Sequence, residues 1–274
     1  MSLPRAKKRL GQNFLVDESY ARRIVNALGA RAGETVVEVG PGRGALTSLL
    51  LETGARVVAV ELDRELVPVL RERFGGRADF ELVEADALEV DFCEAVRPAT
   101  SARVVANLPY NISTAILQRL VEHRRCVPEL VLMLQREVVE RITAPPGSAA
   151  RGYLTVLVEA FCEARALFDV PPGAFRPVPK VWSTVARLRA RADEPEEFDV
   201  SLFLRLVGAG FAQKRKTIHN NLRHAPADLR ALFEPAGGAV ALLEAAGVDP
   251  QRRAEALTLA EWKNLLRALP ARGR

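Results

Sequence analysis

The residues Thr35-Val-Val-Glu-Val-Gly-Pro-Gly-Arg-Gly-Ala-Leu-Thr47 give the clearest indication of the fold of this chain. It begins as a short run of β-branched and apolar residues, turns through three glycines at alternate positions, and continues into apolar residues at helical spacing. A strand that leads through a glycine-rich turn into a helix is the first unit of a parallel α/β sheet. Gly40, Gly42 and Gly44 let the backbone turn tightly and approach a ligand at the carboxyl end of that strand.

The same rhythm repeats through the first half of the chain. Four more short apolar runs follow, and segments with helical spacing separate them. This alternation predicts parallel strands with helices on both faces, which is a Rossmann-like, doubly wound α/β fold. The further strand candidates are residues 56–60, 79–83, 103–106 and 129–134.

The pattern changes beyond residue 143. Two strand candidates, 161–170 and 181–189, flank a proline-rich loop, and an acidic stretch with a proline follows at 190–198. The remaining residues carry helical patterns. We therefore predict an α/β domain of residues 1–195, which includes a basic N-terminal arm, and a smaller C-terminal all-helical domain of residues 196–274.

The composition excludes several classes of protein. Of the 274 residues, 49% are hydrophobic and 27% are charged, which is typical of a folded globular protein. No apolar run reaches the roughly 18 residues of a membrane span, and the basic start does not lead into the hydrophobic region of a signal peptide. We expect a soluble, cytoplasmic protein, and because no oligomer signal stands out we expect a monomer.

Cysteine and histidine give no sign of a metal site. Cys93, Cys126 and Cys162 are widely separated and lack the spacing of metal ligands. None of the three histidines has a partner at such a spacing. We expect no bound metal, and we expect all three cysteines to be reduced thiols in the core.

Basic residues concentrate at both ends of the chain, whose net charge is +5. The first ten residues hold four bases and no acid. From Asp199 onward there are 12 Lys and Arg against 7 Asp and Glu, so this segment alone carries +5. Two such patches can bind a phosphate backbone, but they can equally be solvated surface.

Carboxylates follow the second and third predicted strands. Glu61 can accept hydrogen bonds from both hydroxyls of a ribose, and Asp86 can accept one from an adenine amino group. Leu62 and Ala87 would add apolar walls. The glycine spacing, G-x-G-x-G, differs from the dinucleotide and P-loop patterns, which disfavours nicotinamide and ATP. Either acid could instead cap a helix.

The fourth strand candidate ends in Asn107-Leu-Pro-Tyr110. The Asn107 side-chain oxygen and the Leu108 carbonyl could accept both hydrogens of an exocyclic amino group. Such acceptors would free the nitrogen lone pair from the ring and stabilise the charge that develops on nitrogen. Pro109 stiffens the turn, and Tyr110 offers a face for stacking on an unstacked base. In isolation, the same residues could form an ordinary turn.

Five motifs together resemble the ribosomal RNA adenine N6,N6-dimethyltransferase family, and most closely its bacterial small-subunit type. They occur in the family's order and cover nearly the whole chain. They are Gly11-Gln-Asn-Phe-Leu15, residues 38–47, Asn107-Leu-Pro-Tyr-Asn-Ile-Ser113, Gln135-Arg-Glu-Val138 and Phe175-Arg-Pro-Val-Pro-Lys-Val-Trp-Ser183.

The resemblance implies a reaction and its partners. The cofactor would be S-adenosylmethionine, and the substrate two adjacent adenines near the 3′ end of small-subunit (16S) ribosomal RNA, each methylated twice. The helical domain would dock on the pre-30S ribosomal particle. The implied cofactor contacts are Gln12, Asn13, Leu15, Gly40, Gly42, Glu61, Leu62, Asp86, Ala87 and Asn107.

The resemblance also assigns residues that bind RNA. Phe175 would sandwich the target adenine opposite Tyr110, although the residues alone favour a buried loop anchor for this phenylalanine. A basic segment that we place on a helix of the C-terminal domain resembles the family's basic helix and would neutralise phosphates. The predicted RNA contacts are Arg5, Lys7, Lys8, Arg9, Lys214, Arg215 and Lys216.

Two other functions fit part of the pattern. One is a large-subunit ribosomal RNA adenine N6-methyltransferase of the antibiotic-resistance type, which shares the fold and the catalytic logic. The other is a nucleic-acid-binding factor that keeps the fold without catalysis. The Asn107 motif and the basic C-terminal segment favour the small-subunit enzyme over the first, and the intact cofactor positions favour it over the second.

Overall fold

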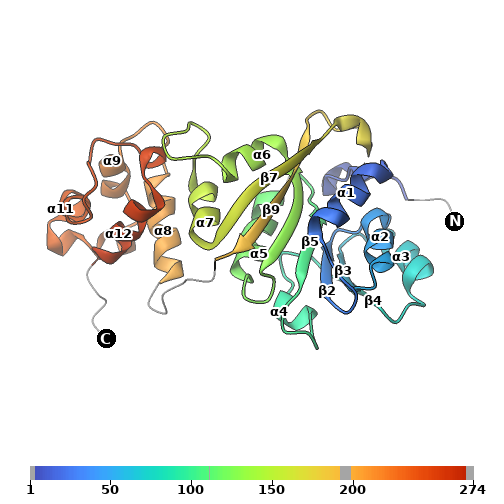
Figure 1. Cartoon of the computed structure of the whole chain (residues 1–274). Helices are drawn as coiled ribbons and strands as arrows, with labels where there is room; N and C mark the ends of the chain where they lie inside the picture. Colours follow the sequence, from blue (N-terminus) through green and yellow to red (C-terminus); the bar gives the residue numbers. More distant parts are fainter. Residues whose placement is uncertain (1–3, 111, 192–198, 270–274) are drawn as a thin grey trace. The chain divides into compact units, whose positions relative to one another are not determined.

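The computed structural model describes residues 4–110, 112–191 and 199–269 (Figure 1). The chain divides into two compact units. The first contains residues 1–139 and 162–190, and the second contains residues 140–161 and 191–274. The first unit is an α/β domain, and the second is helical.

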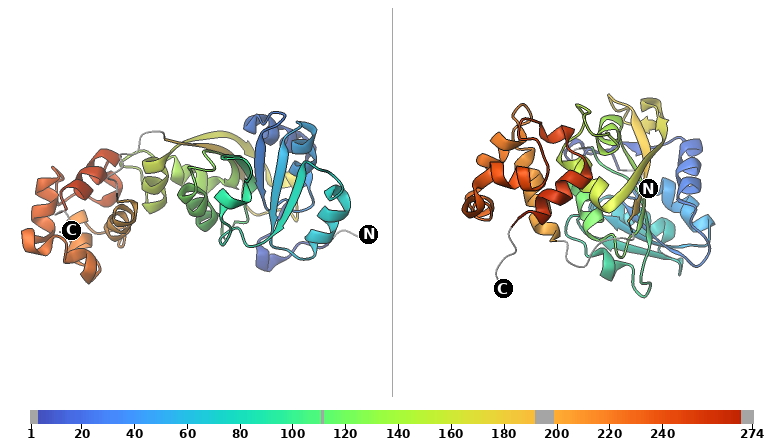
Figure 2. Two further views of the ribbon diagram at one scale, coloured as in Figure 1. Left: turned by 90° about the horizontal axis from the view of Figure 1, so that it is seen from below. Right: turned by 60° about the vertical axis from the view of Figure 1, so that its left-hand side comes forward.

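A seven-stranded sheet forms the core of the first unit, and helices pack on both of its faces (Figures 1 and 2). The strand order is β4-β3-β2-β5-β6-β9-β7; the first five strands are parallel and β9 runs antiparallel between β6 and β7. The strands are β2 (Thr35–Val39), β3 (Arg56–Glu61), β4 (Phe80–Glu84), β5 (Arg103–Asn107), β6 (Glu129–Gln135), β7 (Cys162–Val170) and β9 (Ser183–Ala190).

The order of the strands places a ligand site between β2 and β5. The chain adds β3 and β4 on one side of β2, and β5 and β6 on the other. The helices that follow β2 and β5 therefore lie on opposite faces, which opens a crevice at the carboxyl ends of these two strands. The glycine turn after Val39 and the Asn107 turn both lie there.

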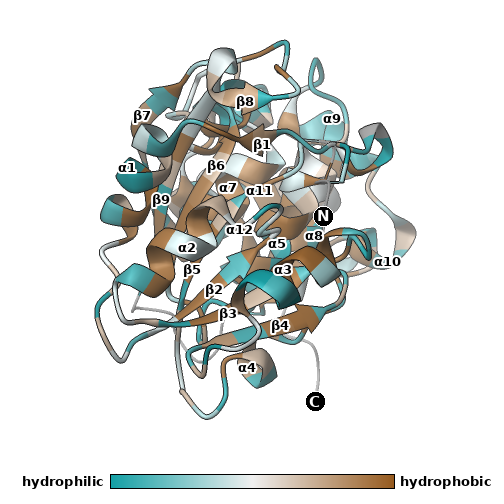
Figure 3. Cartoon of the chain, turned by 90° about the vertical axis from the view of Figure 1, so that its right-hand side faces the viewer, coloured by the Kyte–Doolittle hydropathy of each residue, from teal (hydrophilic) through white to brown (hydrophobic). Residues whose placement is uncertain are grey.

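Burial explains why these segments are strands and helices. Every residue of β2 is buried, as expected for a central parallel strand. Helix α1 buries Ala21, Ile24, Val25 and Leu28, the apolar stripe of a helix on a sheet. Figure 3 shows the result: the strands are mostly brown, and α1 and α3 turn teal sides outward. The helices of this unit are α1 (Glu18–Leu28), α2 (Ala45–Glu52), α3 (Leu66–Phe74), α4 (Phe92–Ala95), α5 (Ser113–Glu122) and the start of α6 (Arg136–Ile142).

A second, two-stranded sheet joins the N-terminal segment, residues 4–15, to the proline-rich loop that precedes β9. Strand β1 (Phe14–Leu15) pairs antiparallel with β8 (Phe175–Arg176). Short 3-10 helices precede the two strands: η1 (Lys8–Leu10) before β1 and η2 (Pro172–Ala174) before β8. Two segments that are about 160 residues apart in the sequence are thus fixed side by side.

The helical unit has its own core, which is built around Trp262 and Phe203, both fully buried. The Trp262 ring stacks on Phe211 with ring centroids 5.6 Å apart. The elements are α7 (Tyr153–Phe161), α8 (Val200–Gly210), α9 (Ile218–Arg223), α10 (Ala227–Arg230), η3 (Glu234–Ala236), α11 (Gly238–Ala245), η4 (Ala254–Ala256) and α12 (Leu259–Arg267).

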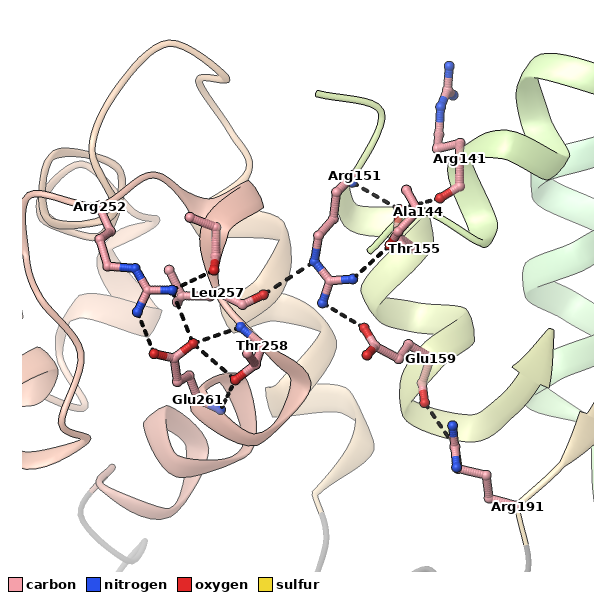
Figure 4. Close-up of polar contacts among 12 residues, drawn as sticks. Arg141, Ala144, Arg151, Thr155, Glu159, Arg191, Arg252, Leu257, Thr258 and Glu261 are labelled. Carbon is pink, nitrogen blue, oxygen red and sulfur yellow. Dashed lines mark hydrogen bonds and ion pairs between the residues drawn. The ribbon is translucent and has the colours of Figure 1, made fainter. Parts of the chain in front are cut away.

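Arg151 holds two parts of the helical unit together (Figure 4). Its guanidinium donates to the carbonyls of Leu257 and Ala144, each at 3.2 Å, and to the Glu159 carboxylate at 2.6 Å. The Arg151 side chain is only 1% exposed. A buried cation is stable only when its hydrogen bonds are made, so these contacts tie the 143–152 segment to the C-terminal helices.

The sequence predicted the fold class correctly, and the division of the chain differs in one respect. Residues 140–161 belong to the helical unit, whereas we assigned them to the α/β domain. Nothing in the pattern of α7 marks it as part of another unit, because its apolar residues would also suit a helix on the sheet. The predicted boundary at residue 196 lies outside the described residues. Among the described helices, none combines the length and apolar character needed to cross a bilayer.

The prediction that all cysteines are reduced was wrong for one pair. Cys93 and Cys126 form a disulfide, with their Cα atoms 5.2 Å apart, while Cys162 is a buried thiol outside this bond. Helix α4 carries Cys93 and precedes β5, and Cys126 lies in the loop before β6. Because β5 and β6 are parallel neighbours, the segments that precede them meet at the same edge of the sheet.

Arg151→Ala tests the role of the buried arginine. The change leaves the Glu159 carboxylate and two carbonyls without their donor, and we expect a loss of about 3–5 kcal/mol in the free energy of unfolding. Urea denaturation followed by circular dichroism measures it. Arg230→Ala is the matched control, because the Arg230–Glu234 pair is partly exposed, with side-chain exposures of 38% and 54%, and an i,i+4 pair of this kind should contribute about 0.5 kcal/mol or less. Equal effects of the two changes would contradict the assignment.

Candidate active site

A cavity opens at the carboxyl ends of β2, β3, β4 and β5. Its lining is mostly apolar with a few polar groups, as is typical of a small-molecule site. Residues from five separate segments line it, and the N-terminal segment forms one wall. The lining residues are Leu10, Gly11, Gln12, Asn13, Phe14, Val39, Gly40, Gly42, Val60, Glu61, Leu62, Leu66, Ala85, Asp86, Ala87, Asn107, Leu108, Pro109, Tyr110, Ile112 and Ile116.

Two glycines of the turn after β2 shape one side of this cavity. Both have positive φ, +69° at Gly40 and +59° at Gly42, a conformation that L side chains rarely adopt. A Cβ on Gly40 would meet no atom within 4 Å, so the missing side chain leaves open space beside the cavity. A Cβ on Gly42 would lie 3.1 Å from the Phe14 ring. The positive φ favours glycine at both positions, and at Gly42 the nearby Phe14 ring favours it as well.

Glu61 presents a buried carboxylate to the cavity. It is 6% exposed, and it accepts hydrogen bonds from the backbone nitrogens of Gly42 at 3.2 Å and Asp63 at 2.8 Å. Burial raises the pKa of Glu61, while these backbone hydrogen bonds oppose the rise. A ligand that donates further hydrogen bonds, as ribose hydroxyls do, would satisfy the remaining acceptor positions.

Asp63 fixes the N-terminal segment over the cavity. Its carboxylate accepts hydrogen bonds from Lys7 Nζ at 2.5 Å and from Gln12 Nε2 at 2.7 Å. Burial would raise the pKa of Asp63, but these bonds outweigh it and the pKa is lowered. The pKa of Lys7 is raised, mainly by its hydrogen bonds to Asp63 and Glu65. The Lys7 ammonium is therefore paired with carboxylates of its own chain, and its contact with RNA stays a prediction.

Asn107 closes the opposite wall, and its orientation is fixed. Its Nδ2 donates to the backbone carbonyl of Asn13 at 3.0 Å. Once the nitrogen is held in this bond, Oδ1 is the atom left to accept a hydrogen from a ligand. The neighbouring peptide is also held, because the nitrogen of the buried Leu108 donates to the Met133 carbonyl at 3.2 Å.

Tyr110 is the aromatic residue of this wall. Its hydroxyl is 2.7 Å from the Ser183 hydroxyl, which anchors the far end of the ring. Burial raises the pKa of Tyr110, and the Ser183 hydrogen bond only partly opposes it. The phenol therefore stays protonated near neutral pH and is not a base. Asn111, part of the same sequence motif, lies outside the described residues.

The structure does not bring two predicted site residues to the cavity. Phe175 is fully buried in the core, where it pairs with Leu15 across the β1–β8 ribbon. Its ring cannot stack on a base from this position, so the residue acts as the loop anchor that the pattern alone favoured. Leu15 is also buried and lines a smaller neighbouring hollow next to the glycine turn. Successive side chains of a strand point to opposite sides. In β1, Phe14 therefore points toward the cavity and Leu15 points away from it.

The basic residues are placed as follows. Lys214, Arg215 and Lys216 are exposed, but they lie in the turn before α9 and not on a helix. Lys214 Nζ donates to the Ala149 carbonyl at 2.7 Å. Arg5 and Arg9 are exposed beside the N-terminal segment. Their contact with RNA, like that of Lys8, stays a prediction.

Several lining residues were missed by sequence reasoning. Phe14, Leu66, Ile112 and Ile116 supply apolar wall, and nothing in their type separates a cavity wall from core packing. Of these four residues, Phe14 could have been predicted to lie near the site, because it is part of the motif of residues 11–15. Arg43 packs over its ring at 4.4 Å. Across the described residues, no group of three or more His, Cys, Asp or Glu side chains is arranged to hold a metal.

Glu38 is a further buried acid beneath the glycine turn. It is 1% exposed and accepts a hydrogen bond from Thr47 Oγ1 at 2.6 Å. Burial raises its pKa to about 7, and the Thr47 bond opposes the rise. The pair joins the end of β2 to the first turn of α2 and so holds the glycine turn between them.

A family model described as ribosomal RNA adenine dimethylase matches residues 4–264. The chain belongs to this family. Two curated relatives, both named ribosomal RNA small subunit methyltransferase A, illustrate the likeness. The one from Hahella chejuensis is 42% identical and the alignment covers 94% of this chain and 90% of the relative. The one from Pseudomonas aeruginosa is 43% identical, with 97% and 95% covered.

Solved structures give the same architecture. A dimethyladenosine transferase from Plasmodium falciparum superposes with a TM-score of 0.76 over 92% of this chain and 96% of that one, at 24% identity, which supports the fold. The 23S rRNA methyltransferase ErmE gives a TM-score of 0.67 over 94% and 100% of the two chains, at 27% identity. The Rossmann-like methyltransferase fold of this rRNA adenine dimethylase family member is thus confirmed.

Glu38→Gln should remove one pH-dependent part of the stability of this family member. The pKa of Glu38 is raised from 4.5 to about 7 in the folded state. Its contribution to the free energy of unfolding is therefore fully present below pH 4.5 and is lost as the pH rises through 7. The difference in unfolding free energy between wild type and Glu38→Gln should fall by roughly 3 kcal/mol across that window. Urea titrations at several pH values measure it. A difference that does not change with pH would refute the raised pKa.

Proposed function

We propose that this protein transfers methyl groups from S-adenosylmethionine to N6 of two adjacent adenines near the 3′ end of small-subunit (16S) ribosomal RNA, each adenine receiving two. The observation that carries the proposal is the fixed amide of Asn107. Its nitrogen bonds to the Asn13 carbonyl at 3.0 Å, and its oxygen is left to accept a hydrogen at the wall of the cavity.

The cavity suits S-adenosylmethionine. The Glu61 carboxylate can accept from the ribose hydroxyls, and Asp86, with Leu62 and Ala87 beside it, can hold the adenine ring. The open space at Gly40 admits a ligand close to the backbone. Gln12 and Asn13 cover the site from the N-terminal segment. When bound, the cofactor would supply a methyl group on a positively charged sulfur.

The protein's own contribution to the reaction is to prepare the target amino group. Asn107 Oδ1 and the Leu108 carbonyl would each accept one N6 hydrogen and draw the nitrogen toward tetrahedral geometry. This frees the lone pair from the purine ring, and the same two acceptors stabilise the positive charge that develops on nitrogen. Pro109 limits the rotation of the turn that holds the Leu108 carbonyl.

Tyr110 would hold the unstacked adenine by its ring and take no part in proton transfer. The hydrogen bond to Ser183 fixes the ring, and stacking on an aromatic face offsets part of the cost of extruding a base. A strong general base is not required, because the methylated nitrogen is a cation that loses its proton readily afterwards. Phe175 has no part in this proposal, since it is buried in the core.

The substrate is the small-subunit RNA rather than that of the large subunit. Relatives 42–43% identical over more than 90% of this chain carry the small-subunit name, whereas the 23S rRNA methyltransferase structure is 27% identical. A cytoplasmic place of action on the pre-30S particle follows from this substrate. A non-catalytic scaffold is disfavoured, because Glu61, Asp86, Asn107 and Tyr110 all line one cavity.

Incubation with labelled methyl donor and unmethylated small subunits tests the function directly. We expect label on N6 of two adjacent adenines near the 3′ end of the RNA, with two methyl groups on each at completion. Free large-subunit RNA serves as the competing substrate and should remain unlabelled. Label on the large-subunit RNA instead, or on neither RNA, would overturn the proposal.

Asn107→Ala should lower kcat for methyl transfer by about 100-fold or more, as loss of one preorganised charge-stabilising group commonly does. The acceptor is felt mainly in the transition state, so the affinity for RNA should change little. Single-turnover assays and RNA-binding titrations measure the two effects. Asn26→Ala, at an exposed position of α1, is the control and should keep wild-type rates. Wild-type turnover of Asn107→Ala would remove this residue from the mechanism.

A further inference from the structure

We propose that the loop of residues 176–182 binds the single-stranded RNA next to the target adenine, with Trp182 stacking on a flanking base and Arg176 and Lys180 contacting its phosphates. The inference rests on the proposed function and specifies how the substrate is held. It concerns a surface outside the cavity.

Trp182 is an unusual residue to leave in solvent. It is 47% exposed, and Val178 and Val181 in the same loop are 56% and 43% exposed. The chain's other tryptophan, Trp262, is fully buried. Large apolar side chains that gather on a surface in this way commonly mark a binding site.

Both ends of the loop are attached to the wall of the active-site cavity. At one end, Arg176 pairs in register with Phe14, which lines the cavity. At the other end, Ser183 follows Trp182 directly and its hydroxyl lies 2.7 Å from the hydroxyl of Tyr110. The exposed tryptophan is therefore one residue from the anchor of the tyrosine that would stack on the target base.

The loop is held in place before any ligand arrives. Pro177 and Pro179 restrict its backbone, and the Trp182 carbonyl accepts a hydrogen bond from the Arg136 nitrogen at 3.0 Å. A ring presented on a restrained backbone loses little conformational freedom when a base stacks on it. This matches an aromatic platform for nucleic acid better than it matches an unstructured loop.

The charge of the loop selects RNA over an apolar protein partner. Arg176 and Lys180 are both exposed, and within the described part of the chain neither forms an ion pair with an acidic side chain. Arg176 uses one guanidinium nitrogen for the Gly173 and Phe175 carbonyls, and its other donors can reach a phosphate. Cations beside an exposed aromatic ring are the combination that binds single strands, through phosphate contacts and base stacking.

Tryptophan fluorescence gives a direct test, because Trp182 is the exposed one of the chain's two tryptophans. The probe is an eight-nucleotide single-stranded RNA with two adjacent adenines. It should quench the emission of the wild-type protein, and the quenching should be absent in Trp182→Leu. The dissociation constant should rise by about 5-fold or more in Trp182→Leu, as for the loss of one stacked base, while Trp182→Phe keeps an aromatic face and loses less.

Two further measurements separate binding from folding. Binding of S-adenosylmethionine should be unchanged in Trp182→Leu, and KM for unmethylated small subunits should rise while kcat is retained. Val240→Ala removes an exposed apolar side chain in the helical unit and should leave the affinities for the oligonucleotide and for S-adenosylmethionine at wild type. Lys180→Ala should weaken binding of the oligonucleotide and reduce its salt dependence.

Specific outcomes would overturn the inference. Equal oligonucleotide affinity in Trp182→Leu and wild type, or no quenching in the wild type, would show that the loop does not stack on RNA. Weaker binding to small subunits with unchanged binding to the oligonucleotide would assign the surface to a ribosomal protein. If the loop binds RNA but no adenine is methylated in the mapping experiment, the proposed function fails and the RNA contact stands.

Discussion

The hydrogen bond from Asn107 Nδ2 to the Asn13 carbonyl, 3.0 Å long, is the interaction on which the rest of the site depends. It joins the end of β5 to a segment almost a hundred residues earlier in the chain, and it decides which atom of the amide can receive a ligand. A rotated amide would present a donor to the N6 hydrogens and repel them. The chemistry thus depends on where the N-terminal segment lies.

Three contacts keep that segment in position. Lys7 and Gln12 are bound to the Asp63 carboxylate, and the β1–β8 pairing continues the attachment beyond Phe14. Asp63 lies two residues after Glu61, so the carboxylate that holds the segment and the carboxylate proposed to bind the ribose both come from the end of β3. The proposed cofactor wall and the proposed reacting centre are therefore joined by a short stretch of backbone, and the loop that carries Trp182 is attached to the same segments.

Much of this could be predicted from the sequence, where the information is local. The glycine turn, Glu61, Asp86 and Asn107 each follow a recognisable strand, and parallel strands bring their carboxyl ends together. Features that depend on contacts between distant parts of the sequence could not be predicted. The burial of Phe175 depends on its pairing with Leu15, the disulfide depends on which strands are neighbours, and Lys7 is a basic residue like any other until Asp63 is placed beside it.

A crystal structure with a nonreactive analogue of S-adenosylmethionine and adenosine would show directly which atoms of Asn107 and Leu108 meet the target amino group. We predict Asn107 Oδ1 and the Leu108 carbonyl oxygen each at about 3 Å from N6 of the adenosine, with Nδ2 still bonded to Asn13 and the Tyr110 ring stacked on the purine. An adenosine whose N6 meets neither oxygen, or an Asn107 amide whose nitrogen faces N6, would show that these two acceptors do not activate the amino group.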